Sequence, residues 1–281
     1  MMCHKLFDRS IMNVLEYFGL NEQPFRIGPD PRYLFYSGQV KEAIAKCEYM
    51  ARDRVGPIYM YGPIGSGKTS ILRRLTERLS SDKRYTVAYV ISANVRRPNT
   101  FLKVIMEAFD VETARSYDTN LKRFEEFLVS QYQKGTIPVL LLDEAQNANR
   151  DALKLIHYLL NFETATIKLL QIVLTGQEEL AARILRYREL ASRMFPIAIN
   201  AMSSKDLEEM IRFRWMVAGG KDMPFVDGDG VYKALYARSK GLPRDAVKVC
   251  DEALRELVAT DRKQATVKDI DVIAEQLNLT K

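Results

Sequence analysis

Gly62-Pro-Ile-Gly-Ser-Gly-Lys-Thr69 is the stretch that decides the fold of this 281-residue chain. It matches the pattern G-x-x-x-x-G-K-[S/T], follows the apolar residues Ile58–Tyr61 and opens a stretch whose apolar residues recur at helical spacing. A glycine-rich turn between a strand and a helix points successive backbone N–H groups at one centre, and the helix N-terminus adds partial positive charge. The stretch therefore predicts a cradle for the phosphates of ATP or GTP.

The residues of this loop have distinct expected roles. Gly62, Gly65 and Gly67 allow backbone conformations that a Cβ would forbid. Lys68 is expected to reach the β- and γ-phosphates, and the Thr69 hydroxyl is expected to bind Mg²⁺. The nucleotide-binding set predicted from the loop is Gly62, Pro63, Ile64, Gly65, Ser66, Gly67, Lys68, Thr69 and Ser70.

Two adjacent acids follow a second apolar run. Val139–Leu142 ends in Asp143 and Glu144, and side chains alternate faces along a strand, so one acid can face a metal while the next faces water. Asp143 is expected to support the Mg²⁺ shell, and Glu144 to orient and deprotonate the attacking water. Thr175, at the end of another apolar run, is expected to help position that water. Beside the phosphate loop, these residues predict ATP hydrolysis rather than a solvated acidic turn.

Between residues 57 and 200, apolar runs of strand length alternate with amphipathic stretches of helix length. This alternation predicts an α/β fold, with a parallel sheet flanked by helices on both sides. The expected strands are Pro57–Tyr61, Tyr85–Ile91, Ile137–Leu142, Leu169–Thr175 and Pro196–Ile199. The expected helices between them are Ser70–Leu79, Thr100–Phe109, Leu121–Gln133, Asp151–Asn161 and Glu178–Leu185.

After Ile199 the strand pattern disappears. The helical stretches there predict a C-terminal all-helical domain, with Ser203 and Thr266 as helix N-caps. Its expected helices are Lys205–Ala218, Val231–Ser239, Arg244–Ala259 and Val267–Leu277. The predicted domains are an N-terminal extension and aromatic arm at 1–36, the α/β nucleotide-binding domain at 37–202, and the helical domain at 203–281.

Composition narrows the class of protein. The three cysteines, Cys3, Cys47 and Cys250, form no CxxC pair, which favours reduced thiols in a cytoplasmic protein over a disulfide framework or zinc site. The sequence shows no signal peptide and no apolar run of the roughly 18 residues that a membrane span needs, so no membrane insertion is expected. A formal charge of +6 favours a polyanionic partner.

The chain resembles the AAA+ P-loop NTPases, and within them the ATPases of the general secretion pathway A type. The resemblance rests on the phosphate loop, the Asp143-Glu144 pair, and the segments Tyr17–Leu20, Pro24-Phe25, Pro29–Leu34, Gly241–Arg244 and Cys250–Leu254. It implies that the C-terminal helical domain is a lid and that Arg244 contacts nucleotide within the same chain. It also implies that Arg193, or else Arg188, is an arginine finger reaching a neighbouring subunit, so that hydrolysis needs a homo-oligomer, a ring or helical filament.

The chain is also similar to the ATP-dependent target-selection regulators of transposons, because the membrane segment and peptidoglycan-binding region of the secretion proteins are not found in it. That similarity implies a regulator that oligomerises with ATP on duplex DNA, without sequence preference, and recruits a transposase. Cations and short polar side chains after the second expected strand suit phosphate contacts. The expected DNA-binding residues are Arg96, Arg97, Asn99, Thr100 and Lys103, and in a second row Thr119, Asn120, Lys122 and Arg123.

Two other functions remain open from the residues alone. A replication initiator or helicase loader would share the ATPase and the DNA contacts but serve a helicase. A secretion-assembly ATPase would act on protein partners, and its hydrolysis would not respond to DNA. A nucleotide-binding scaffold without turnover is disfavoured, because both Asp143 and Glu144 are present. Residues 1–11 are expected to be a poorly ordered extension.

Overall fold

A computed structural model describes residues 13–28, 30–92, 97–226 and 230–279, and these form two compact units. The α/β unit comprises Gly38–Pro63 and Lys68–Ile199. The helical unit comprises the described residues up to Ser37, the segment Ile64–Gly67, and the chain from Asn200 onward. The expected extension at residues 1–11 and the expected DNA contact Arg96 lie outside the described residues.

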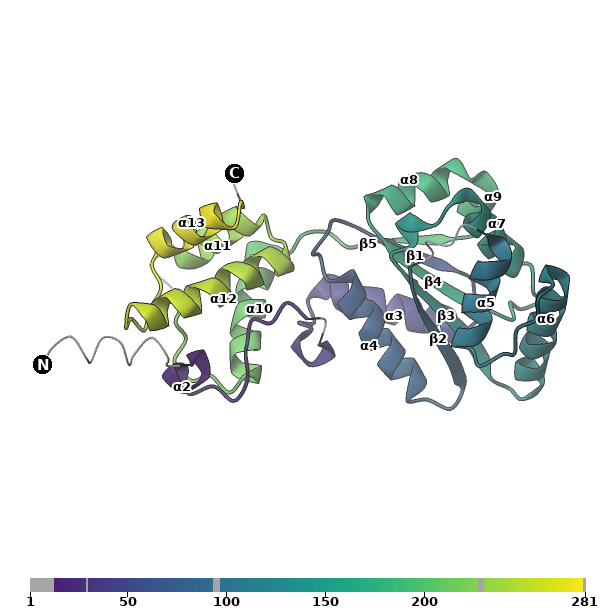
Figure 1. The fold of residues 1–281 in the computed structure, drawn as a ribbon, viewed down its shortest axis with the longest axis horizontal. Coiled ribbons are helices and arrows are strands. Elements are labelled where there is room, and N and C mark those ends of the chain that lie inside the picture. The colour runs from purple at the N-terminus through teal and green to yellow at the C-terminus, as the bar shows by residue number, and fades with distance from the viewer. Residues whose placement is uncertain (1–12, 29, 93–96, 227–229, 280–281) are drawn as a thin grey trace, which may run out of the picture. The chain divides into compact units, whose positions relative to one another are not determined.

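The α/β unit is built on a five-stranded parallel sheet (Figure 1). The strands follow the order β2-β3-β4-β1-β5, and each described pairing is parallel. Because the strands are parallel, their carboxyl ends share one edge of the sheet, and the residues that follow β1, β3 and β4 gather there. The predicted fold class is confirmed. The strands are β1 (Ile58–Tyr61), β2 (Tyr85–Ile91), β3 (Ile137–Asp143), β4 (Gln171–Gly176) and β5 (Phe195–Ala198).

Helices cover both faces of this sheet (Figure 1). The central strand β3 is buried along its whole length, and its Leu140 and Leu142 lie in a large apolar cluster with Phe101 and Phe124. The opposite face packs against α3 and α4. The helices of this unit are α3 (Gly38–Arg52), α4 (Lys68–Ser80), α5 (Pro98–Ala108), α6 (Tyr117–Gln133), η3 (Ala145–Asn147), α7 (Arg150–Leu159), α8 (Glu178–Arg186) and α9 (Arg188–Ala191). Three of these elements, α3, η3 and α9, were not expected from the sequence.

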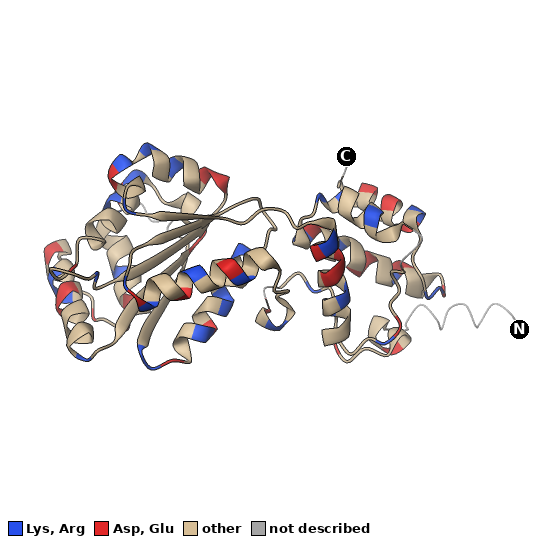
Figure 2. Cartoon of the chain, turned by 180° about the vertical axis from the view of Figure 1, so that it is seen from behind, with Lys and Arg blue, Asp and Glu red and all other residues tan. Residues whose placement is uncertain are grey.

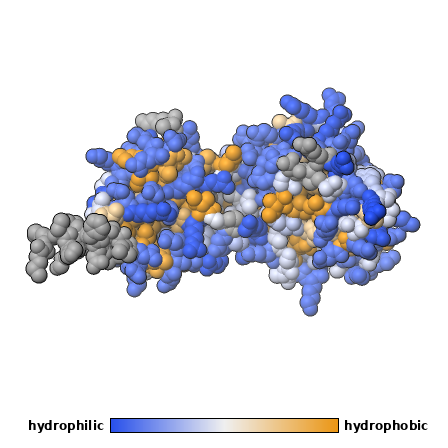
Figure 3. Space-filling model, viewed as in Figure 1, coloured by the Kyte–Doolittle hydropathy of each residue, from blue (hydrophilic) through white to orange (hydrophobic). Residues whose placement is uncertain are grey.

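The helical unit has its own apolar core. Ser203 caps α10 and Thr266 caps α13 through side-chain acceptors, as expected. The elements are α2 (Val14–Phe18), η2 (Pro31–Tyr33), α10 (Ser204–Val217), α11 (Val231–Ser239), α12 (Pro243–Ala259) and α13 (Val267–Gln276). No helix within the described ranges is long and apolar enough to cross a membrane. The visible face of each unit is mostly hydrophilic (Figure 3), since the apolar side chains are concentrated in the two cores.

The aromatic N-terminal arm, described at residues 13–28 and 30–37, is part of the helical unit. Phe25 is fully buried and packs against Trp215 and Phe225, with ring centroids 6.5 and 5.9 Å away. The guanidinium of Arg214, on α10, donates to the carbonyl of Pro24 at 2.9 Å and to that of Arg26 at 2.8 Å. Burial lowers the pKa of Arg214 to about 10. The arm is therefore fixed to α10 by a buried cation as well as by apolar packing.

Candidate functional site

The loop of residues 62–67 joins the end of β1 to the start of α4, the context that the motif requires. A Cβ at Gly62 would lie 2.0 Å from the carbonyl oxygen of Ile199, so only glycine fits where the loop leaves the strand. Gly67 has a φ of 98°, in the region that side-chain-bearing residues rarely adopt. The loop therefore depends on glycine at both its beginning and its end.

Lys68 is held inside this loop by the loop's own backbone. Its ammonium donates to the carbonyl oxygens of Gly62 at 2.9 Å and Pro63 at 2.8 Å, and the residue is only 9% exposed. Lys68 is the first residue of α4, and Thr69 and Ser70 follow in the first helical turn, where backbone N–H groups lack acceptors within the helix. The Lys68 ammonium, the Thr69 hydroxyl and the N–H groups of the first helical turn thus lie together at the start of α4, which is the chemistry that a phosphate chain needs.

Asp143 ends β3 at the same edge of the sheet and is almost fully buried. Its Oδ1 accepts hydrogen bonds from the hydroxyl of Thr175 at 2.5 Å and from the backbone N–H of Glu144 at 2.9 Å. Its Oδ2 accepts from the hydroxyl of Tyr89 at 3.2 Å. Tyr89 is on β2 and Thr175 on β4, so the strands on both sides of β3 fix the orientation of one carboxylate.

Tyr89 is a site residue that the sequence analysis did not identify. Burial, with a smaller contribution from the charge of Asp143, raises the pKa of Tyr89 to about 12. The phenol therefore remains a neutral donor at physiological pH. Thr175 is completely buried, and its hydroxyl is committed to Asp143; the water-positioning role expected for it remains a prediction.

Glu144 has a left-handed backbone, with φ 50° and ψ 35°, where the chain turns from β3 into η3. Its Oε2 accepts a hydrogen bond from the side-chain amide of Gln146 at 2.6 Å. Gln146 is buried, and its own amide oxygen accepts the backbone N–H of Gln177 at 3.2 Å. Gln146 is the second residue that the sequence analysis missed, although its position two residues after Glu144 was a visible signal.

The three expected arginines lie in different parts of the chain. Arg193 is exposed just before β5 and donates to the side-chain oxygen of Asn161. Arg188 is exposed at the start of α9. Arg244 lies in the first turn of α12, in the helical unit. Their roles as finger and sensor remain proposals.

The residues expected to contact DNA differ in how exposed their side chains are. Asn120 is fully buried and bonds to Asn99 and to the backbone of Ala114, so the expectation that it contacts DNA is wrong. Asn99 is half-buried, and its amide also donates to the carbonyl of Arg115 at 3.0 Å, which indicates a structural role. Among the other expected contacts, Arg97, Thr100, Thr119 and Lys122 are exposed, and Lys103 and Arg123 are half-buried. Arg123 also pairs with the carboxylate of Glu112 at 3.6 Å.

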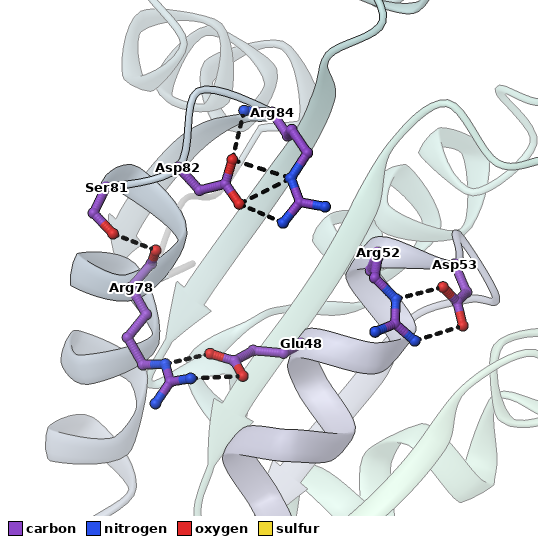
Figure 4. A network of polar contacts seen from close by, with 7 residues as sticks. All are labelled: Glu48, Arg52, Asp53, Arg78, Ser81, Asp82 and Arg84. Atoms are coloured by element: carbon purple, nitrogen blue, oxygen red, sulfur yellow. Dashed lines mark hydrogen bonds and ion pairs between the residues drawn. The ribbon is translucent and has the colours of Figure 1, made fainter.

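The positive charge of the α/β unit is distributed along several helices, where Lys and Arg are interspersed with Asp and Glu (Figure 2). A cavity of about 500 Å³ lies at the amino edge of the sheet, where α3 and α4 end and β2 begins. Figure 4 shows the polar contacts of its charged residues. Its three arginines are each paired with a carboxylate: Arg52 with Asp53, Arg78 with Glu48, and Arg84 with Asp82. Each carboxylate offsets the charge of its arginine, and the cavity lies at the edge of the sheet opposite the carboxyl ends of the strands.

Comparison with known proteins agrees with this geometry. Residues 51–184 match the family model of the AAA domain. The chain contains an AAA domain. It is 31% identical over 270 residues to General secretion pathway protein A of Aeromonas hydrophila, and the match covers 94% of this chain and 48% of that protein. The chain thus spans about half the length of this curated relative.

Several solved structures share the fold of this chain at low sequence identity. The Aeropyrum pernix ORC2 protein, solved as ADPNP–ADP complexes, has a TM-score of 0.62 and 16% identity; the match covers 85% of this chain and 67% of that one. The Aeropyrum pernix ORC1 protein, solved in complex with DNA, has a TM-score of 0.65 and 17% identity, with 91% of this chain and 69% of that one covered. At these identities the likeness concerns the fold.

Proposed function

We propose that this chain is a DNA-binding AAA+ ATPase that hydrolyses ATP to ADP and phosphate. It would oligomerise on duplex DNA and regulate a protein partner. The most specific form of this proposal is that it recruits a transposase to its target. The observation that carries the ATPase part is the convergence of two features at one sheet edge. The phosphate loop with Lys68 follows β1, and the Asp143-Glu144 pair lies at the end of β3, two strands away. A relative's ADPNP–ADP complexes support the same kind of ligand.

The metal fits the donors that are present. Mg²⁺ takes oxygen ligands and usually keeps several of its waters. The Thr69 hydroxyl would ligate it directly, and Asp143 would hold its waters, because Thr175 and Tyr89 already fix the carboxylate. When bound, the ion would neutralise charge on the β- and γ-phosphates. Glu144 would then accept the proton of the attacking water.

We propose that the chain forms a homo-oligomer, because Arg193 can reach a neighbouring subunit. Arg193 is exposed, so its guanidinium is accessible to a neighbouring subunit once it exchanges the Asn161 oxygen for a phosphate. A finger supplied in trans would make hydrolysis depend on oligomer formation. Arg244 would contact the nucleotide from within the same chain, and Arg188 is the alternative finger.

DNA binding is proposed through the exposed or half-buried residues of two segments, the start of α5 and the first turns of α6. Their cations and hydroxyls suit phosphate oxygens and carry no base-reading pattern, which favours binding without sequence preference. The DNA complex of the ORC1 relative supports this class of partner. The proposed contacts are Arg97, Thr100, Lys103, Thr119, Lys122 and Arg123.

A second candidate is a secretion-assembly ATPase that acts on protein partners. It is favoured by the 31% identity to General secretion pathway protein A along 94% of this chain. A replication initiator or helicase loader is the third alternative, since it would use the same ATPase and DNA contacts.

The deciding experiment is the ATPase rate of the purified full chain with and without duplex DNA, at low and at raised salt. The proposal expects Mg²⁺-dependent hydrolysis that DNA stimulates, with the stimulation lost as salt screens the phosphate contacts. Hydrolysis that is indifferent to DNA would support the secretion candidate. Pull-down with a transposase or with a replicative helicase then separates the two DNA-dependent alternatives.

A further inference from the structure

Gln146 is a buried polar side chain that contacts the proposed water-activating acid directly. Its amide N–H donates to Oε2 of Glu144 at 2.6 Å, and its amide oxygen accepts the backbone N–H of Gln177 at 3.2 Å. Gln177 is the first residue after β4 and precedes α8. One buried amide thus connects the proposed base, after β3, with the tip of the neighbouring strand.

The direction of this amide is fixed by its two partners. A carboxylate can only accept, and a backbone N–H can only donate. Rotating the amide by 180° would place its oxygen against the Glu144 carboxylate and its NH₂ group against the Gln177 N–H. Both contacts would then be repulsive, so a single orientation remains.

Gly176 leaves the space that Gln146 occupies. A Cβ at Gly176 would lie 2.7 Å from the amide oxygen of Gln146 and 2.9 Å from a methyl carbon of Leu180. The strand end is therefore shaped so that a buried glutamine fits between β4 and the turn that carries Glu144. Because Gln146 is only 8% exposed, water does not readily replace either hydrogen bond.

We propose that Gln146 is a positioning residue for ATP hydrolysis: it holds Oε2 of Glu144, so that the other oxygen, Oε1, takes the proton from the attacking water. This inference rests on the proposed ATPase function. In the step itself, the water proton moves to Oε1, the water oxygen forms a bond to the γ-phosphorus, and the bond from that phosphorus to the β–γ bridging oxygen breaks to release ADP. Because Gln146 also bonds to the backbone of Gln177, a movement of the backbone between β4 and α8 would change the orientation of Glu144.

The first test replaces Gln146 with methionine, which has a similar length but no hydrogen-bonding amide. We expect kcat to fall about 10- to 100-fold, as for a misplaced catalytic group, while KM for ATP changes less than about threefold. The matched control is Gln133→Met, the same change at an exposed position at the end of α6. A Gln146→Met protein that folds and keeps the wild-type kcat would overturn the inference.

The second test uses Gln146→Glu and measures kcat from pH 6 to pH 9. A protonated carboxyl at 146 can donate to Glu144 as the amide does, whereas an ionised one repels it, and the neighbouring charge raises its pKa. We therefore expect the ratio of variant to wild-type kcat to rise as the pH falls. A ratio that is constant with pH would contradict a donor role, and this readout decides the question even if the methionine variant does not fold.

These tests separate the inference from the function on which it rests. If the wild-type chain binds ATP but never hydrolyses it, with or without DNA, the proposed function fails. If the wild type hydrolyses ATP and both Gln146 variants behave like it at every pH, only the positioning role fails.

Discussion

Polar residues are arranged differently at the two edges of the sheet in the α/β unit. At the carboxyl edge, a few buried groups converge: Asp143 receives hydrogen bonds from Tyr89 and Thr175, and Lys68 is held by loop carbonyls. At the amino edge, the cavity is lined by three arginines, and adjacent carboxylates pair with all of them, as the contacts in Figure 4 show. The number of charges is larger at the amino edge. Burial and convergence, rather than charge count, therefore indicate where a phosphate chain would bind.

Replacement of Lys68 by alanine should produce the largest difference between the two edges. The change removes the only cation that the loop itself contributes, so we expect ATP affinity to fall about 100-fold or more, as for loss of a buried charge-assisted contact. Titration with a fluorescent ATP analogue measures it. Lys46→Ala, at an exposed position on α3, is the control. Unchanged affinity in Lys68→Ala would place the nucleotide elsewhere.

The next effect is expected from Glu144→Gln. An amide cannot accept the water proton, so kcat should fall about 10²- to 10⁴-fold while ATP binding persists. The variant should accumulate as ATP-bound oligomers on DNA, which size-exclusion chromatography with and without duplex DNA detects. Wild-type hydrolysis by this variant would show that Glu144 is not the base.

Tyr89→Phe should have a smaller effect. It removes one of the hydrogen bonds to Asp143 and leaves that of Thr175, so we expect a two- to tenfold loss in kcat, equivalent to one neutral hydrogen bond. Because the pKa of Tyr89 is raised to about 12, the phenol stays protonated below pH 10. The ratio of variant to wild-type activity should therefore be constant from pH 6 to 10. A ratio that changes within that range would mean that Tyr89 titrates.

The smallest effect is expected at the amino edge. Arg84→Ala removes an exposed ion pair with Asp82, which contributes little in water. We expect unchanged ATP affinity, and a shift of no more than about 2 °C in the midpoint of thermal unfolding. Calorimetry together with the ATP titration checks both. A large loss of ATP binding in Arg84→Ala would remove the contrast between the edges.

Local patterns were sufficient for much of the fold. The apolar run Tyr85–Ile91 predicted β2 at both ends, and each other strand was placed within two residues, because runs of buried apolar residues bounded by polar ones define strands locally. The helix α3 was missed, although Val40, Ile44 and Cys47 recur at helical spacing and are buried. Its signal was present but was not used.

The sequence was sufficient to identify the main residues of the site, but it did not predict the hydrogen bonds between them. The motif identified Lys68, and the acidic pair identified Asp143 and Glu144, because their chemistry depends on adjacent residues. The hydrogen bond from Tyr89 depends on β2 lying beside β3, and that from Gln146 depends on Gly176 leaving room. Asn120 shows the opposite error, since a polar residue near a helix start was taken as exposed and is buried in a network with Asn99.

The hydrogen bonds between Arg214 and the arm have a consequence for synthesis on the ribosome. The guanidinium and the carbonyl of Pro24 are separated by 190 residues in sequence. At about 5–20 residues per second, the arm emerges on the order of 10–40 s before α10. During that interval Phe25 has no Trp215 or Phe225 to cover it, and all five strands of the sheet are translated before α10 appears. Phe25 thus stays without its packing partners until α10 and the residues after it are made, which gives a chaperone time to bind the arm.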